Sequence, residues 1–368
     1  MSLDPDAPAG ADPPQPAAAT ADAATSPATA DSGTSTTPAG PETGSAGGGR
    51  LLGFIERYAL VILFAITFLF FSFWSKTSAT FPTSANIKNV LSSQAVVGIL
   101  AMAIIIPLTC GEFDFSVGSI AGLTQVLCAG FLTRLGWPVG LAILVPIGIG
   151  AFVGLSNGNT VARIGVNSLI VTLGVSTVLA GVVEWYTGGQ SILISSSSEL
   201  VKLGSGDWLG IPRTVYYLAV VALGVYYLLE HTPYGRYLQS IGSNSEAARL
   251  VGLRVDLLVL LAFVISGALA GFAGILWVGS NGSASPQLGT VANTLQALAA
   301  AYLGATAIKP GRFNVVGTLV AIFFLAFTVT GLSLAGVQNW INDVFNGAAL
   351  FVAVLISTII GRKRAGVA

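Results

Sequence analysis

The chain has 368 residues, of which 53% are hydrophobic and only 9% are charged, and its mean hydropathy is +0.79. A soluble domain carries about 25% charged residues. The apolar residues here form long blocks that can pack only against lipid and one another. The net charge is zero, which leaves no basic surface for nucleic acid. The composition therefore predicts an all-α polytopic membrane protein.

Residues with catalytic or metal-binding chemistry are scarce. Cys110 and Cys128 lie in apolar blocks without metal-ligand spacing, and His231 is the only histidine, so we expect no metal site. The sequence has no Walker A pattern, so P-loop ATP hydrolysis is not expected of this chain. We therefore expect that the chain is not an enzyme and holds no cofactor of its own. Any chemical energy that drives its function must come from another protein.

Residues 1–50 differ from the rest in composition. They are rich in Ala, Pro, Thr, Ser and Gly, with six acidic residues and no basic residue before Arg50. Such a segment buries too little apolar surface to offset its ordering entropy, which predicts a disordered tail. It lacks the basic start and apolar run of a secretory signal, so we expect it to stay in the cytoplasm.

Residues 51–364 are predicted to form the transmembrane domain. A span needs about 20 apolar residues, and ten candidates follow in order: 56–74, 89–110, 115–134, 138–160, 166–186, 213–230, 257–280, 292–308, 314–335 and 343–361. An even number places both termini on one side. With the termini inside, the inner segments carry eleven Lys and Arg residues and the outer segments five, so both termini are expected in the cytoplasm.

The two longest connections are predicted to face opposite sides, with 187–212 outside and 231–256 inside. In the inner loop, Ser243 and Glu246 have capping-box spacing, and Gly252 is placed to end a short helix. This helix either rests on the membrane surface or docks into a groove on a cytoplasmic partner. The candidate docking residues are Gly242, Ser243, Asn244, Glu246, Ala247, Ala248, Arg249 and Gly252.

Glu112 and Asp114 interrupt an apolar block of about 45 residues, where unpaired charges are costly. Asp114 is expected either to cap the next helix, accepting the N–H groups of Ser116 and Val117, or to line a translocation path. The candidate path residues, each also suited to interhelical hydrogen bonds, are Glu112, Asp114, Ser116, Asn157, Thr172, Asn281 and Gln296.

The inner loop resembles the Glu-Ala-Ala-type coupling loop of bacterial ABC importer permeases, in particular the ribose, xylose and galactose branch. The likeness covers most of residues 86–361. Its motifs are Gly111-Glu112-Phe113-Asp114-Phe115-Ser116-Val117-Gly118-Ser119, Asn157-Gly158, Leu169-Ile170-Val171-Thr172-Leu173-Gly174, and Gly235-Arg236-Tyr237 leading to Glu246.

The resemblance implies a type II ABC importer-like permease of the bacterial cytoplasmic membrane that moves a monosaccharide or related polyol by alternating access. It also implies three kinds of partner: a second permease subunit, a pair of ATPase subunits that carry ATP and Mg²⁺, and an extracytoplasmic sugar-binding protein. The chain departs from the family at 304–313, where Gly-Ala-Thr-Ala-Ile-Lys-Pro-Gly-Arg-Phe replaces a run with more glycines.

Three other interpretations stay open. A permease for branched-chain amino acids or nucleosides would share the architecture and the docking loop. An ion-coupled secondary transporter needs an ionisable residue near the membrane midplane, and only Glu112 and Asp114 qualify. A membrane enzyme needs clustered catalytic side chains, which the sequence does not show.

Overall fold

The computed structural model describes residues 46–195, 198–338 and 340–364, and the chain from Gly47 onward forms one compact unit. Residues 1–45 of the predicted tail lie outside the described residues. Helix α1 (Ala46–Phe73) begins before Arg50, so the last five residues of the predicted tail are helical. Each residue added to a formed helix gains a hydrogen bond, which carries α1 past its apolar block.

Each of the ten predicted spans corresponds to a helix. After α1 these are α2 (Ser84–Thr109), α3 (Val117–Thr133), α4 (Val139–Asn159), α5 (Ser168–Thr187), α7 (Arg213–His231), α10 (Val255–Asn281), α11 (Val291–Gly304), α12 (Val315–Leu334) and α13 (Trp340–Arg364). Among the described residues, six helices are long and apolar enough to cross a membrane: α2, α4 with its π-helical extension η1 (Thr160–Ile164), α5, α7, α10 and α12.

Helix α11 is shorter than the predicted span at 292–308. Its 14 residues rise only about 21 Å at 1.5 Å per residue, whereas the bilayer core is about 30 Å thick. The chain reaches α11 through a non-helical segment held by Gln125, whose Nε2 donates to the carbonyl oxygens of Ser285 (2.9 Å) and Leu288 (3.0 Å). An apolar block of the right length therefore need not be one complete crossing.

Two small antiparallel ribbons modify the all-α prediction. Strand β1 (Ile192–Leu193) pairs with β4 (Ser283–Ala284), and β2 (Asp207–Trp208) pairs with β3 (Ile211–Pro212) in a hairpin. Helix α6 (Glu199–Gly204) lies between β1 and β2 in sequence. Both ribbons belong to the connections between spans, where backbone groups without a helical partner must find another one.

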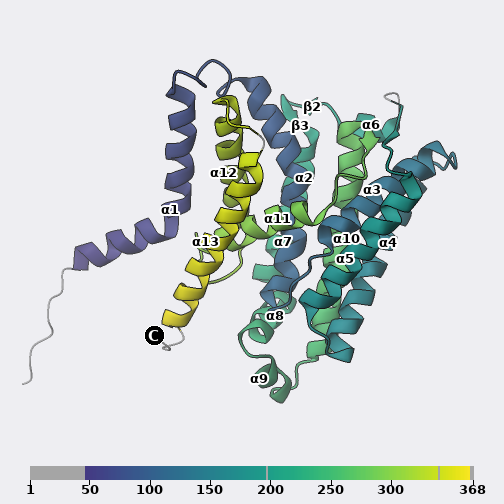
Figure 1. Cartoon of the computed structure of the whole chain (residues 1–368). Coiled ribbons are helices and arrows are strands. Elements are labelled where there is room, and N and C mark those ends of the chain that lie inside the picture. Colours follow the sequence, from purple (N-terminus) through teal and green to yellow (C-terminus); the bar gives the residue numbers. More distant parts are fainter. Residues whose placement is uncertain (1–45, 196–197, 339, 365–368) are drawn as a thin grey trace, which may run out of the picture. The chain divides into compact units, whose positions relative to one another are not determined.

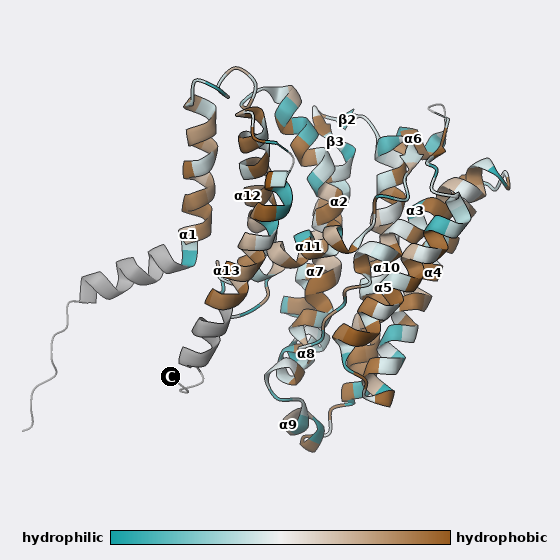
Figure 2. Cartoon of the chain, viewed as in Figure 1, coloured by the Kyte–Doolittle hydropathy of each residue, from teal (hydrophilic) through white to brown (hydrophobic). Residues whose placement is uncertain are grey.

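Helix α10 is central to the bundle and packs against α2, α3 and α4. Glycines allow α4 and α10 to meet backbone to backbone: a Cβ at Gly154 would lie 2.2 Å from the Phe263 carbonyl oxygen, and one at Gly267 would lie 2.3 Å from that of Gly150. Small residues permit such close approach where lipid supplies no hydrophobic drive. Figure 2 shows α4 and α12 mostly brown, as expected of helices that meet lipid and apolar neighbours.

The bundle has two distinct ends. The first turns of α2 meet the β2–β3 hairpin, where the Lys88 ammonium lies 2.6 Å from the Asp207 carboxylate. The other end of α2 meets α8 (Pro233–Ser243) and so leads to α9 (Ser245–Leu250). Figure 1 shows β2 and β3 at one end and α9 at the other. We call these the hairpin end and the α9 end.

Candidate functional site

The short helix predicted in the 231–256 loop is present as α9, but its cap differs from the prediction. Asn244 is the N-cap, in an extended conformation, and its side-chain oxygen accepts the Ala247 N–H at 2.9 Å. Ser243 instead ends α8, so the predicted capping box of Ser243 with Glu246 is wrong. Both Ser and Asn are good N-caps, and the continuation of α8 through Ser243 selects Asn244.

The end of α9 is as predicted. Gly252 has φ +85°, a left-handed conformation that glycine adopts without steric cost. The Gly252 N–H donates to the Arg249 carbonyl (3.0 Å) and the Leu253 N–H to the Ala248 carbonyl (3.1 Å). These two bonds form a Schellman motif, which satisfies the last carbonyls of the helix. A six-residue helix is therefore fixed at both ends.

The apolar surface of α9 points mainly away from the protein. Ala248 is buried, whereas Leu250 is 89% exposed and the following Val251 is 77% exposed. Glu246, Ala247 and Arg249 are exposed as well. Leu250 and Val251 were not among the predicted docking residues, and their place in an otherwise polar loop was the available signal. Adjacent exposed apolar side chains on a rigid tip form a surface suited to a protein partner.

Helix α8 fastens α9 to the bundle. A Cβ at Gly242 would lie 2.3 Å from the Thr109 carbonyl oxygen, so α8 touches the end of α2 backbone to backbone. The Tyr234 hydroxyl donates to the Leu258 carbonyl of α10 at 3.1 Å, and burial raises the pKa of this phenol. The Arg249 guanidinium of α9 pairs with Asp256 in the first turn of α10 at 2.5 Å. These contacts connect the α8–α9 segment to both α2 and α10.

Two grooves flank the α8–α9 segment. One, of about 580 Å³, places Glu112 with Glu246, Arg249 and the π-helical turn η1. The other, of about 570 Å³, is lined by Arg236 and Arg312 together with α9 residues. Glu112, predicted on the translocation path, thus lies beside Glu246 and Arg249, two of the predicted docking residues, at the α9 end.

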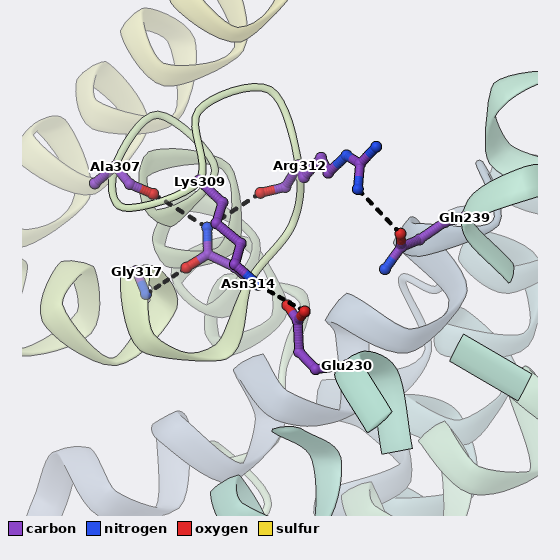
Figure 3. Close-up of polar contacts among 7 residues, drawn as sticks. All are labelled: Glu230, Gln239, Ala307, Lys309, Arg312, Asn314 and Gly317. Carbon is purple, nitrogen blue, oxygen red and sulfur yellow. Dashed lines mark hydrogen bonds and ion pairs between the residues drawn. The ribbon is translucent and has the colours of Figure 1, made fainter. Parts of the chain in front are cut away.

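The connection between α11 and α12 is built around Asn314, the N-cap of α12 (Figure 3). Its Nδ2 lies 3.1 Å from the carbonyl oxygens of Gly304, Ala307 and Arg312, and its Oδ1 accepts the Gly317 N–H at 2.7 Å. This buried amide supplies the bonds that fold the connection, although the sequence departs here from the resembled family.

The same connection is tied to α7 and α8, as Figure 3 also shows. The Lys309 ammonium lies 2.6 Å from the Glu230 carboxylate at the end of α7. The Arg312 guanidinium donates to the Gln239 side-chain oxygen of α8 at 3.3 Å. These two polar contacts thus link α7 and α8 to the connection that leads into α12.

Asp114 is buried between α2 and α3, at the predicted break. Its Oδ1 accepts from the Ser116 N–H (3.1 Å) and hydroxyl (2.6 Å), and its Oδ2 accepts from the Ser266 hydroxyl of α10 (3.0 Å). Ser116 is the N-cap position of α3. The predicted contact with the Ser116 N–H is present, but Asp114 lies two residues before the cap. Three hydrogen bonds compensate a buried carboxylate that would otherwise be costly.

This network gathers four of the predicted path residues. The Asn157 side-chain amide of α4 donates to the Ser116 hydroxyl at 2.9 Å. On α5, the Thr172 and Ser168 hydroxyls accept the Phe115 and Phe113 N–H groups, each at 3.1 Å. Asp114, Ser116, Asn157 and Thr172 are all buried. The side chains of Ser168, Thr172 and Asp114 thus accept the N–H groups of Phe113, Phe115 and Ser116, which irregular backbone within a membrane bundle requires.

Asn281 and Gln296 lie elsewhere. Asn281 is exposed at the last residue of α10. Gln296 of α11 is half-buried, and its Nε2 lies 3.3 Å from the side-chain oxygen of Gln94 on α2. Within the described residues no group of three or more His, Cys, Asp or Glu side chains could hold a metal ion. The seven predicted path residues therefore lie at four separate places rather than in one site: the α9 end, the network around Asp114, the end of α10, and α11.

Among the described residues, the six apolar helices of membrane length are those of a polytopic membrane protein. Residues 86–354 match the family described as "Branched-chain amino acid transport system / permease component", and the chain belongs to this family. The resemblance inferred from the motifs is confirmed.

Individual relatives support the same assignment. The chain is 33% identical over 303 residues to the ribose import permease protein RbsC of Escherichia coli (strain K12), covering 81% of this chain and 91% of that protein. It is 27% identical over 383 residues to the xylose transport system permease protein XylH of the same strain, covering 88% and 96%. The L-arabinose ABC transporter permease protein AraH of Azospirillum brasilense is 31% identical over 301 residues, covering 82% and 87%. No solved structure matches the chain.

Proposed function

We propose that this chain is the membrane-spanning permease of an ATP-driven importer in the bacterial cytoplasmic membrane, with both termini in the cytoplasm. The observation that carries the proposal is α9, a capped helix with Leu250 and Val251 exposed at its tip. A helix this short is marginal alone in water, and its apolar tip gains stability by entering a groove on another protein. The partner is an ATPase subunit that binds ATP and Mg²⁺.

The contacts of α8 suggest how the ATPase drives transport. When the ATPase pair closes, α9 moves with it, and the contact of Gly242 with Thr109 passes this movement to α2. The contacts of Lys309 with Glu230 and of Arg312 with Gln239 pass it to α12. The helices then change their packing, and the path opens to the cytoplasm.

The transported solute is a monosaccharide, a pentose, hexose or related polyol delivered by an extracytoplasmic binding protein. The basis is that the relatives above are named for ribose, xylose and L-arabinose. The family description names branched-chain amino acids, which makes such a permease the second candidate. Pairing with a second permease subunit, alike or homologous, completes the path.

Two polar sites are suited to contact a sugar on its path. The amide pair of Gln94 and Gln296 offers donors and acceptors between α2 and α11. The side-chain oxygen of Asn157 is buried without a hydrogen-bond partner in the described part of the protein, so it can accept from a sugar hydroxyl once the helices change their packing. The α2–α3 connection beside it is positioned by Asp114, Ser116 and Thr172. Glu112 belongs with the docking residues of α9. Asn281 lies at the end of α10 that is farther from α9.

The docking role is tested by capturing the ATPase encoded beside this gene on the purified permease, with Leu250→Asp as the test variant. The matched control is Leu193→Asp, a leucine of β1 that is 76% exposed near the opposite end. We expect capture by the wild type and the control and loss in Leu250→Asp. Equal capture by both variants would refute docking through α9.

The solute is tested separately by uptake into proteoliposomes that contain the permease and ATPase, with the neighbouring binding protein outside. Labelled ribose, xylose, arabinose and leucine are compared. ATP-dependent accumulation of a sugar supports the proposal, whereas accumulation of leucine alone supports the amino-acid permease.

A further inference from the structure

The turn between β2 and β3 presents an unusual residue. Leu209 has φ +52° and Gly210 has φ +79°, the two positive φ angles of a type I′ hairpin turn. Asn, Asp or Gly normally occupy such positions, because a bulky side chain is strained there. Leu209 is nevertheless the turn residue, and it is 98% exposed. The hairpin thus holds a large apolar side chain outward at its tip.

The hairpin is held in place by specific contacts. The Tyr216 hydroxyl of α7 donates to the Trp208 carbonyl at 2.9 Å, and Lys88 of α2 pairs with Asp207 at 2.6 Å. The Arg213 guanidinium lies 5.3 Å from the centre of the Trp208 ring and donates to the Lys202 carbonyl. Leu209 is therefore exposed at the tip of a hairpin that side chains of α2 and α7 hold in place.

The length of α7 places the hairpin at the membrane surface. Its 19 residues from Arg213 to His231 rise about 28 Å, close to the thickness of the hydrocarbon core. The hairpin ends at Pro212, directly before α7 begins. It therefore lies where the acyl chains meet the headgroups.

An uncharged surface continues from the hairpin along α7. Val220, Leu223 and Tyr227 are exposed on this helix, and no charged residue occurs from 214 to 229. At the hairpin, Trp208 packs against Tyr216 and Tyr217 with ring centres 5.7 and 6.4 Å apart. Aromatic residues of this kind gather at the membrane–water boundary. Lys202 and Arg213 lie beside them, where cationic side chains meet lipid phosphates, whereas Lys88 is paired with Asp207.

We propose that the β2–β3 hairpin is a lipid anchor, with Leu209 inserted between the acyl chains and Trp208 at the headgroup level. The partner is the bilayer itself, because the apolar tip continues the lipid-facing surface of α7 and cations flank it. Insertion of Leu209 offsets the strain of its backbone. The proposal depends on the membrane-spanning helices and not on the transported solute.

The test places a nitroxide spin label on Leu209→Cys in lipid nanodiscs and compares its collisions with oxygen, which partitions into lipid, and with a water-soluble nickel chelate. Cys110 and Cys128 are buried, and position 209 is exposed enough to accept the label without disturbing the fold. Val220→Cys, 69% exposed on α7, serves as the lipid-facing control. Glu199→Cys, exposed on α6, serves as the water-facing control.

We expect the ratio of oxygen to nickel collisions at position 209 to approach that at 220 and to exceed that at 199 several-fold. A ratio at 209 equal to that at 199 would overturn the proposal. A loss of both kinds of collision at 209 on adding the extracytoplasmic binding protein would overturn it too, since a protein would then cover the tip. Neither measurement requires the ATPase.

Discussion

Replacement of Gly154 by Ala tests the packing of α4 against α10 most sharply. The added Cβ would lie 2.2 Å from the Phe263 carbonyl oxygen, 2.9 Å from its carbonyl carbon and 3.2 Å from the Val264 Cα. All three are backbone atoms, so no rotamer change relieves the overlap. The helices must separate by about 1 Å, and overpacking of this kind costs about 1–3 kcal/mol. Because backbone meets backbone, we expect Gly154→Ala to lower the free energy of unfolding by about 3 kcal/mol.

The matched control is Gly148→Ala on the same helix. A Cβ at Gly148 meets no atom within 4 Å, and Ala is favoured over Gly in a helix by up to about 1 kcal/mol. Thermal unfolding of the purified proteins in detergent should show Gly154→Ala melting several degrees below the wild type and Gly148→Ala at or above it. Equal melting temperatures for the two variants would refute the close α4–α10 packing.

Three further variants probe the α11–α12 connection and the path. Lys309→Glu removes an exposed ion pair worth at most about 1 kcal/mol, so we expect thermal stability to hold while ATP-driven uptake falls. Adding Glu230→Lys in the same chain should restore uptake. Failure of that rescue would count against the link to α12. Asn314→Ala loses a cap and leaves buried carbonyls unpaired, at about 1–3 kcal/mol; an unchanged melting temperature would contradict this. Asn157→Ala should reduce sugar uptake with ATPase capture intact, and normal uptake would remove Asn157 from the path.

The helical ranges could be predicted from the sequence because they depend on local composition. Blocks of apolar residues located all ten predicted helices, although α1 begins ten residues before its predicted start at 56. Gly252 marked the end of α9. The start of α8 could also have been predicted, because Thr232 is a suitable N-cap and Pro233 follows it in the first turn. In the structure the Thr232 hydroxyl accepts the Gly235 N–H at 3.3 Å. The N-cap of α9 was missed by one residue, because both Ser243 and Asn244 are suitable and only the run of α8 decides.

The remainder depends on contacts between distant parts of the chain. Asp114 receives a hydrogen bond from Ser266, 152 positions away, and no local pattern indicates that pairing. The non-helical entry to α11 depends on Gln125, which binds carbonyls more than 150 residues later. The exposure of Leu250 was indicated only by its place in a polar loop, and the orientation of its side chain away from the bundle depends on how α8 and α9 pack. The candidate residues could thus be listed from the sequence, but tertiary packing decides which of them lie together.

ATP-driven uptake by the assembled system tests the central claim most directly. Proteoliposomes containing the permease and its ATPase, with the binding protein outside and ATP inside, are given labelled pentose in the absence of an ion gradient. We predict saturable accumulation that requires ATP and is abolished by Leu250→Asp. Accumulation without ATP that follows an imposed proton or sodium gradient and is unchanged in Leu250→Asp would contradict the account and identify an ion-coupled transporter.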